Sequence, residues 1–279
     1  MDEQPQVPQP REVFFVIIAG FFGTLLVMQV VILLLVGSDP EAINANGLAE
    51  LLAVVGELGL AVFPVLYLRK KDYSLQRLFR WNPVPGRVLL LSLPLGAALT
   101  ILGDELDRLI QMFIPMPDLV QEMLLSLKAE TPLEWILMIL GAVVIAALVE
   151  ESIIRGLLQI SLEHYQNVTR AVIYASLIWT AIHMMIYWAV QIFLLGVILG
   201  YLAWRTNSIW PSALCHGMNN AAALLFLNLQ LDQRLPGYLW NGHVSPLLVL
   251  PALILVVKII QYLDGYYRLA AVSESSELD

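Results

Sequence analysis

Long apolar stretches alternate with short polar ones along almost the entire chain. The clearest apolar stretches, residues 14–36 and 247–263, approach or exceed the roughly 20 residues that a helix needs to cross a bilayer core of about 30 Å. This pattern predicts helices over residues 14–36, 47–68, 87–108, 132–162, 170–187, 190–205, 209–228 and 246–263. The sequence therefore predicts an all-α protein, a polytopic transmembrane bundle of about eight helices.

Local signals define the ends of some helices better than others. Thr131-Pro132-Leu133-Glu134 has the pattern of a capping box with proline at the first helical position, and Ser245-Pro246 repeats the cap followed by proline. A turn near Trp188 is predicted only because a single helix over residues 170–205 would overshoot the bilayer. Residues 118–128 are expected to form a short amphipathic helix at the membrane interface.

The uneven distribution of Lys and Arg among the loops predicts the orientation of the bundle. The second loop, from Arg69 to Arg87, is rich in both residues, whereas the first loop, residues 37–46, contains neither. Because cytoplasmic loops carry the excess of basic residues, the second loop and both termini are expected in the cytoplasm. We therefore expect a multi-pass integral membrane protein, located in the plasma membrane if the source is prokaryotic.

Composition agrees with a membrane location and excludes several classes of function. Hydrophobic residues make up 59% of the chain and charged residues 14%, and the mean hydropathy is +0.75, outside the usual range of soluble domains. A formal net charge of -8 speaks against nucleic acid as a partner and leaves membrane lipid as the expected one. Cys215 is the only cysteine, which excludes an intrachain disulfide and a cysteine-rich metal site.

Two adjacent carboxylates, Glu150 and Glu151, interrupt the apolar fourth helix. Each charged residue at a helix centre costs roughly 2.5 to 3.5 kcal/mol on insertion, so both are expected to have a use. Arg155 follows Glu151 by four residues, about 40° around the helix, and can pair with it. One arginine offsets only one carboxylate, so a purely structural ion pair does not explain both. Glu150 is left without a local partner, which suits a group that takes up and releases a proton.

Polar residues of two further helices are expected at the same depth in the membrane. His183 ends a Trp179-x-x-x-His pattern in the fifth helix, and His216 and Asn220 share one face of the seventh. In a hairpin of helices four and five, Glu150 and His183 both lie roughly 20 Å from the connecting turn. A water activated by Glu150 and His183 can then attack a peptide carbonyl, while His216 and Asn220 donate hydrogen bonds to the oxyanion.

Three further residues are candidates for contact with the substrate, and one carboxylate has no assigned role. Trp179 is expected to form a wall of the pocket, and Tyr187 and Asn219 are candidates for substrate binding. Glu57, midway along the second helix, either serves the substrate path or pairs with Arg108.

The three motifs together resemble the CAAX prenyl endopeptidases of the Ras-converting-enzyme type, a family whose prokaryotic relatives include bacteriocin-processing and immunity proteins. That family shows Glu-Glu-x-x-x-Arg, Phe-x-x-x-His and His-x-x-x-Asn on three membrane helices. The corresponding residues here are Glu150, Glu151, Arg155, Trp179, His183, His216 and Asn220. The resemblance covers a catalytic core at about residues 133–228, and Trp179 replaces the usual phenylalanine.

The resemblance implies an intramembrane endopeptidase that cleaves a peptide bond near the C terminus of a lipidated or membrane-bound protein by a glutamate-dependent mechanism. In eukaryotic members the substrates are prenylated proteins. Outside the core, residues 1–13 are expected to form a cytoplasmic N-terminal tail, residues 14–268 the transmembrane domain and residues 269–279 an acidic C-terminal tail.

Two other classes of function stay open. A metalloprotease could use Glu150, Glu151, His183 and His216 as ligands, although the chain lacks a His-Glu-x-x-His pattern and Arg155 would compete for Glu151. A non-catalytic immunity or transport protein is the other alternative, because ionisable groups in membranes also mark ion paths. The preferred mechanism requires neither a metal nor another cofactor.

Overall fold

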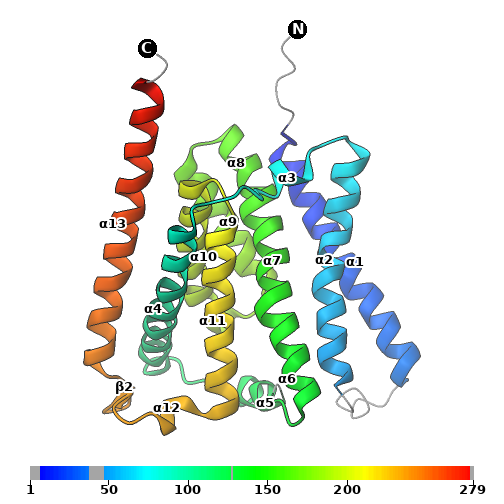
Figure 1. Ribbon diagram of the computed structural model, residues 1–279. Helices are drawn as coiled ribbons and strands as arrows, with labels where there is room; N and C mark the ends of the chain where they lie inside the picture. Colours follow the sequence, from blue (N-terminus) through cyan, green and yellow to red (C-terminus); the bar gives the residue numbers. More distant parts are fainter. Residues whose placement is uncertain (1–6, 38–46, 127, 277–279) are drawn as a thin grey trace.

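The computed structural model describes residues 7–37, 47–126 and 128–276 of the 279-residue chain. Within these ranges the fold is an all-α bundle with one two-stranded hairpin (Figure 1), which confirms the predicted fold class. The elements are α1 (Pro10–Val36), α2 (Leu48–Lys70), α3 (Leu75–Leu78), α4 (Gly86–Gln111), α5 (Asp118–Ser126), α6 (Pro132–Met138), η2 (Ile139–Ile145), α7 (Ala146–Glu151), η3 (Ser152–Leu158), α8 (Gln159–Tyr165), α9 (Val168–Ile182), η4 (Ile186–Trp188), α10 (Ala189–Thr206), α11 (Trp210–Leu229), α12 (Leu231–Arg234), β1 (Leu239–Trp240), β2 (His243–Val244) and α13 (Pro246–Ser276).

Six helices of the described chain are long and apolar enough to cross a membrane. They are Pro10–Val36, Leu48–Lys70, Gly86–Gln111, Pro132–Tyr165, Ile186–Thr206 and Pro246–Leu269. The helix Pro132–Tyr165 is continuous through α6, η2, α7, η3 and α8, and η2 and η3 are π-helical. Helices α9 and α11 complete the bundle, but α9 is shorter, with 15 residues. The chain is therefore a multi-pass membrane protein.

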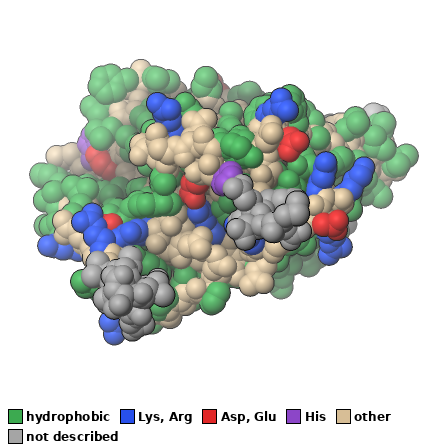
Figure 2. Space-filling model, turned by 90° about the horizontal axis from the view of Figure 1, so that it is seen from above, with side chains coloured by type: hydrophobic (Ala, Val, Ile, Leu, Met, Phe, Trp, Pro, Cys, Tyr) green, Lys and Arg blue, Asp and Glu red, His purple; other side chains and the backbone are tan. Residues whose placement is uncertain are grey.

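The two long terminal helices lie on opposite sides of the bundle, α1 beside α2 and α13 beside α4 (Figure 1). The start of α1 and the end of α13 lie at the same end of the molecule as α3. Figure 2 views this end, and Lys and Arg side chains are scattered over it. Both features are those expected if this end faces the cytoplasm, and the side of the membrane stays a prediction.

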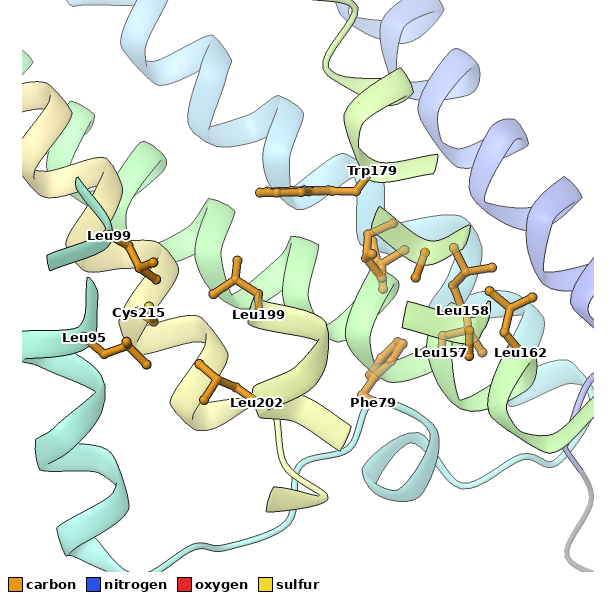
Figure 3. Close-up of a cluster of buried hydrophobic side chains, with 14 of the residues drawn as sticks. Phe79, Leu95, Leu99, Leu157, Leu158, Leu162, Trp179, Leu199, Leu202 and Cys215 are labelled. Atoms are coloured by element: carbon orange, nitrogen blue, oxygen red, sulfur yellow. The ribbon is translucent and has the colours of Figure 1, made fainter. Parts of the chain in front are cut away.

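The buried core connects α4 and α11 through α10 to the long central helix (Figure 3). Leu199 and Leu202 of α10 lie between Cys215 of α11 and the leucines of η3 and α8. A Cβ atom at Gly156 would lie 2.7 Å from the Cα atom of Phe79, so glycine allows the turn after α3 to pack against η3. This contact holds the loop between α2 and α4 close to Arg155.

Most predicted helix ends agree with the structure, and the differences are local. Thr131 and Glu134 form the capping box, with the Thr131 Oγ1 atom accepting from the Glu134 amide at 3.3 Å. The fifth helix ends at Ile182, before the predicted residue 187, because Met184 adopts φ +53° and breaks the helical run. The last helix continues to Ser276, past the predicted start of the C-terminal tail at residue 269.

Candidate active site

The glutamate pair lies on a short α-helical segment between two π-helical ones. Helix α7 has six residues and ends at Glu151, with η2 before it and η3 after it. π-Helical turns are rare and occur frequently at functional sites, where the extra residue redirects side chains. In η2 the carbonyl oxygen of Ala142 accepts a hydrogen bond of 2.9 Å from the Asn220 side chain. The irregular helix therefore connects the first motif to the third.

Glu151 is completely buried and is held by two basic groups. Arg155 Nη1 lies 2.7 Å from Glu151 Oε1, and both side chains are at most 1% exposed. His216 Nδ1 lies 3.1 Å from the same oxygen and is 3% exposed. Because a carboxylate only accepts, the Nδ1 atom of His216 carries the hydrogen. The predicted pairing of Glu151 with Arg155 is thus present, and His216 joins it.

Glu150 belongs to a separate group of side chains. The indole nitrogen of Trp179 donates a 2.5 Å hydrogen bond to Glu150 Oε2, and His183 Nε2 lies 3.9 Å from that same oxygen. His183 Nδ1 lies 2.8 Å from the carbonyl oxygen of Trp179, which can only accept, so Nδ1 is the protonated nitrogen. A neutral His183 therefore presents the lone pair of Nε2 toward Glu150.

Trp179 joins the two groups. Its ring lies between the rings of His183 and His216, with centroid distances of 4.8 and 5.4 Å, and the guanidinium carbon of Arg155 lies 4.1 Å from its centroid. The large indole thus fixes both histidines and the arginine in one packed unit. The sequence predicted Trp179 as a wall of the pocket, but gave no sign of its hydrogen bond to Glu150.

A cavity of about 220 Å³ opens beside Glu150. Its polar lining consists of Glu57, Glu150, His183 and the edge of Trp179. Its apolar lining comes from α1, α2, η3 and α9, through Ile17, Phe21, Leu60, Ile153, Ile154 and Ile182. Glu151, Arg155, His216 and Asn220 are not among the lining residues. The arrangement offers an apolar substrate space with two carboxyl groups on its wall.

Two sequence candidates lie away from this cavity. Asn219 accepts a hydrogen bond of 3.3 Å from Thr100 and lines a different cavity, beside α4 and α10. The Tyr187 hydroxyl group is buried without a hydrogen-bond partner in the described part of the chain, and it is not in the lining of the Glu150 cavity. Their role in substrate binding stays a prediction that this geometry does not support.

Glu57 lines the cavity and does not pair with Arg108. Arg108 instead forms ion pairs with Asp104 at 3.2 Å and with Asp232 at 3.5 Å. The alternative that Glu57 pairs with Arg108 is therefore wrong. The sequence feature that indicated a place for Glu57 at the cavity was its position midway along a membrane helix without a local basic partner.

The possible metal ligands do not converge in the residues that the structure describes. No group of three or more His, Cys, Asp or Glu side chains there could hold a metal ion. Glu150 and His183 form one pair and Glu151 and His216 another, and Arg155 occupies the shared oxygen of Glu151. This donor arrangement does not fit a tetrahedral zinc site.

Residues 132–222 match the family model described as Rce1-like, type II CAAX prenyl endopeptidase Rce1-like. The matched segment runs from the start of α6 into α11 and contains all three motifs. The match confirms the resemblance seen in the motifs and supports an intramembrane protease. Neither a curated protein nor a solved structure matches the chain.

Proposed function

We propose that this chain, with its Rce1-like segment, is a glutamate-dependent intramembrane endopeptidase that cleaves a membrane-associated protein near its C terminus. One observation carries the proposal. Of the two adjacent glutamates, only Glu150 faces the cavity, and a histidine nitrogen lies 3.9 Å from its carboxyl oxygen, whereas Glu151 is already paired with Arg155. We therefore assign Glu150 to catalysis and Glu151 to a structural role.

The gap between Glu150 and His183 is suited to a water molecule. At 3.9 Å the Glu150 Oε2 and His183 Nε2 atoms are too far apart for a direct hydrogen bond, and both are acceptors when His183 is neutral. A water between them can donate one hydrogen to each, which directs an oxygen lone pair into the cavity. Attack on a peptide carbonyl then transfers a proton from the water to Glu150.

His216 and Asn220 are the proposed donors to the oxyanion of the tetrahedral intermediate. Glu151 holds His216 through Nδ1, which leaves the Nε2 side of the ring for the substrate. An amide nitrogen carries two hydrogens, and the contact with Ala142 uses only one of those on Asn220. A Cβ atom at Gly217 would lie 2.8 Å from the Val143 carbonyl oxygen, so glycine allows the close approach of α11 to η2 that positions both donors.

The proposed substrate is a lipidated or otherwise membrane-bound protein, with prenylated C termini as the first class to test. The apolar lining from Ile17, Phe21 and Leu60 is compatible with an apolar segment entering from the α1–α2 side. The similarity to CAAX prenyl endopeptidases supports cleavage near the C terminus. Both termini are proposed to be cytoplasmic, as the distribution of Lys and Arg predicts.

The test is hydrolysis of a prenylated C-terminal peptide by the purified protein, with the cleavage site read by mass spectrometry. We expect a single scissile bond and a loss of turnover in Glu150→Gln. Glu122→Gln, which changes an exposed carboxylate on α5, is the matched control and should cleave at the wild-type rate. Cleavage by Glu150→Gln at the control rate would refute the proposed function.

A further inference from the structure

Glu57 carries a half-buried carboxyl group that none of the three motifs uses. It lies midway along α2 and lines the same 220 Å³ cavity as Glu150, which comes from α7. Its Oε2 atom is buried without a hydrogen-bond partner among the described residues. A second carboxyl group therefore stands at the centre of the proposed chemistry.

The surroundings of the two carboxyl groups differ in a way that assigns their charges. Two negative charges in one apolar cavity repel each other, so the proposed chemistry gives the two carboxyl groups one proton to share. Trp179 donates a hydrogen bond to Glu150 Oε2, so this carboxyl group already acts as an acceptor. Glu57 receives no such bond in the described structure and pairs with no Lys or Arg there. The shared proton is thus placed on Glu57.

We propose that Glu57 is a second catalytic residue, a carboxylic acid that protonates the leaving amine. This role rests on the proposed function, because it acts in the same peptide hydrolysis. It separates the two proton transfers that the reaction needs. Glu150 accepts a proton from the attacking water, and Glu57 supplies one to the nitrogen as the peptide bond breaks.

The step balances without any further reactant. The water oxygen bonds to the carbonyl carbon, one water proton passes to Glu150, and the other stays on the new carboxyl group. Collapse of the intermediate breaks the carbon–nitrogen bond, and the nitrogen takes the proton of Glu57. The products are a carboxylic acid and an amine. Transfer of the proton from Glu150 to Glu57 across the shared cavity restores the starting state.

A comparison of two leaving groups tests this role. The probes are a prenylated peptide with a scissile amide and a 4-nitrophenyl ester of the same prenylated acyl segment, whose phenolate leaves without a proton. For Glu57→Gln we expect the kcat for the amide to fall about 100-fold or more, the usual range of general acid catalysis, and ester turnover to stay near wild type. Glu150→Gln should lower both activities.

Glu50→Gln is the matched control, because Glu50 lies on the same helix but outside the cavity lining. It should change neither activity. The role of Glu57 would be overturned if Glu57→Gln lost amide and ester turnover equally, or lost no amide turnover. The proposed function would still stand in either case, provided that the wild-type protein cleaves the amide and that this cleavage depends on Glu150. A wild-type protein that hydrolyses neither probe would refute the proposed function, and the role of Glu57 with it.

A second variant keeps the test decisive if Glu57→Gln fails to accumulate in membranes. Glu57→Asp keeps the acid and withdraws it by about one bond from the cavity. The proposal requires the ratio of amide to ester turnover to fall in this variant as well. An unchanged ratio in a folded Glu57→Asp protein would contradict it.

Discussion

Trp179 donates its indole hydrogen to Glu150 across 2.5 Å, from a helix position at which the resembling family usually carries phenylalanine. The hydrogen bond orients the carboxylate, and the ring packs between the histidines of the second and third motifs. Trp179 therefore combines an aromatic contact with a polar one. Replacing Trp179 by phenylalanine should therefore affect catalysis.

Trp179→Phe should fold and bind substrate but turn over more slowly. Phenylalanine keeps an aromatic ring against Arg155 and removes the donor to Glu150. A hydrogen bond to a charged group contributes about 1.5 to 3 kcal/mol, which corresponds to a fall in kcat of about tenfold or more if the bond orients the base. The measurement is the kcat and KM for the prenylated peptide. An unchanged kcat would show that the indole has no part in catalysis.

The buried ion pair of Glu151 and Arg155 predicts a stability effect that Glu150 should not show. Removing one partner leaves a charge uncompensated in the protein interior, at a cost of about 3 to 5 kcal/mol. Glu151→Gln and Arg155→Ala should therefore lower the melting temperature in detergent, and Glu150→Gln should lower it less.

Arg268→Ala supplies the control for this comparison. The pair of Arg268 with Asp264 has a similar length, 2.7 Å, but Arg268 is 75% exposed, so its loss should leave the melting temperature nearly unchanged. If the Glu151 and Arg155 variants melt like Arg268→Ala, the structural role of the buried pair is wrong.

Asn220 separates the oxyanion mechanism from the metal-dependent alternative. Asn220→Ala should lose about 100- to 1,000-fold in turnover, as removal of one oxyanion donor typically does. Asn220→Asp should be equally poor, because a carboxylate directs negative charge toward the oxyanion, whereas a metal site would tolerate it. Turnover is measured before and after metal depletion. Activity that vanishes on depletion, returns with zinc and persists in Asn220→Asp would favour the metalloprotease.

The orientation of the bundle can be tested with two cysteines at its opposite ends. Gln76 is exposed on α3, and Gln233 is exposed on α12 at the far end. In a Cys215→Ala background, Gln76→Cys should react with a membrane-impermeant maleimide only in inverted vesicles, and Gln233→Cys only in intact cells. The native Cys215 is buried, and its replacement leaves the introduced cysteine as the single thiol in each variant. Labelling of both sites from one side would contradict the predicted topology.

The sequence was sufficient to predict the helices and the three motifs because both depend on local patterns. Apolar length defined the spans, and the i,i+4 spacing paired Glu151 with Arg155. The cavity could not be predicted, because it forms where α1 and α2 meet η3 and α9. The same holds for Glu57, whose surroundings are set by tertiary packing and not by its sequence neighbours.

The positions of two predicted substrate contacts also depend on tertiary structure. Asn219 and Tyr187 are close in sequence to site residues, but the helical turn places Asn219 toward Thr100, and the chain reversal at Met184 carries Tyr187 away from the cavity. The contact of Asn220 with Ala142 depends on the π-helical geometry of η2, which no residue pattern indicated. The spacing of residues along the sequence predicts which side chains share one face of a helix. It does not predict which other helix packs against that face.

Glu150 is proposed to act in the chemical step and not in folding or binding. The most direct measurement compares wild type and Glu150→Gln in one preparation, by the Kd for the prenylated peptide and by its rate of cleavage in a single turnover. We expect an unchanged Kd, a melting temperature close to that of wild type and a cleavage rate at least about 100-fold lower. A Glu150→Gln protein that binds the peptide and cleaves it at the wild-type rate would contradict a catalytic role for Glu150.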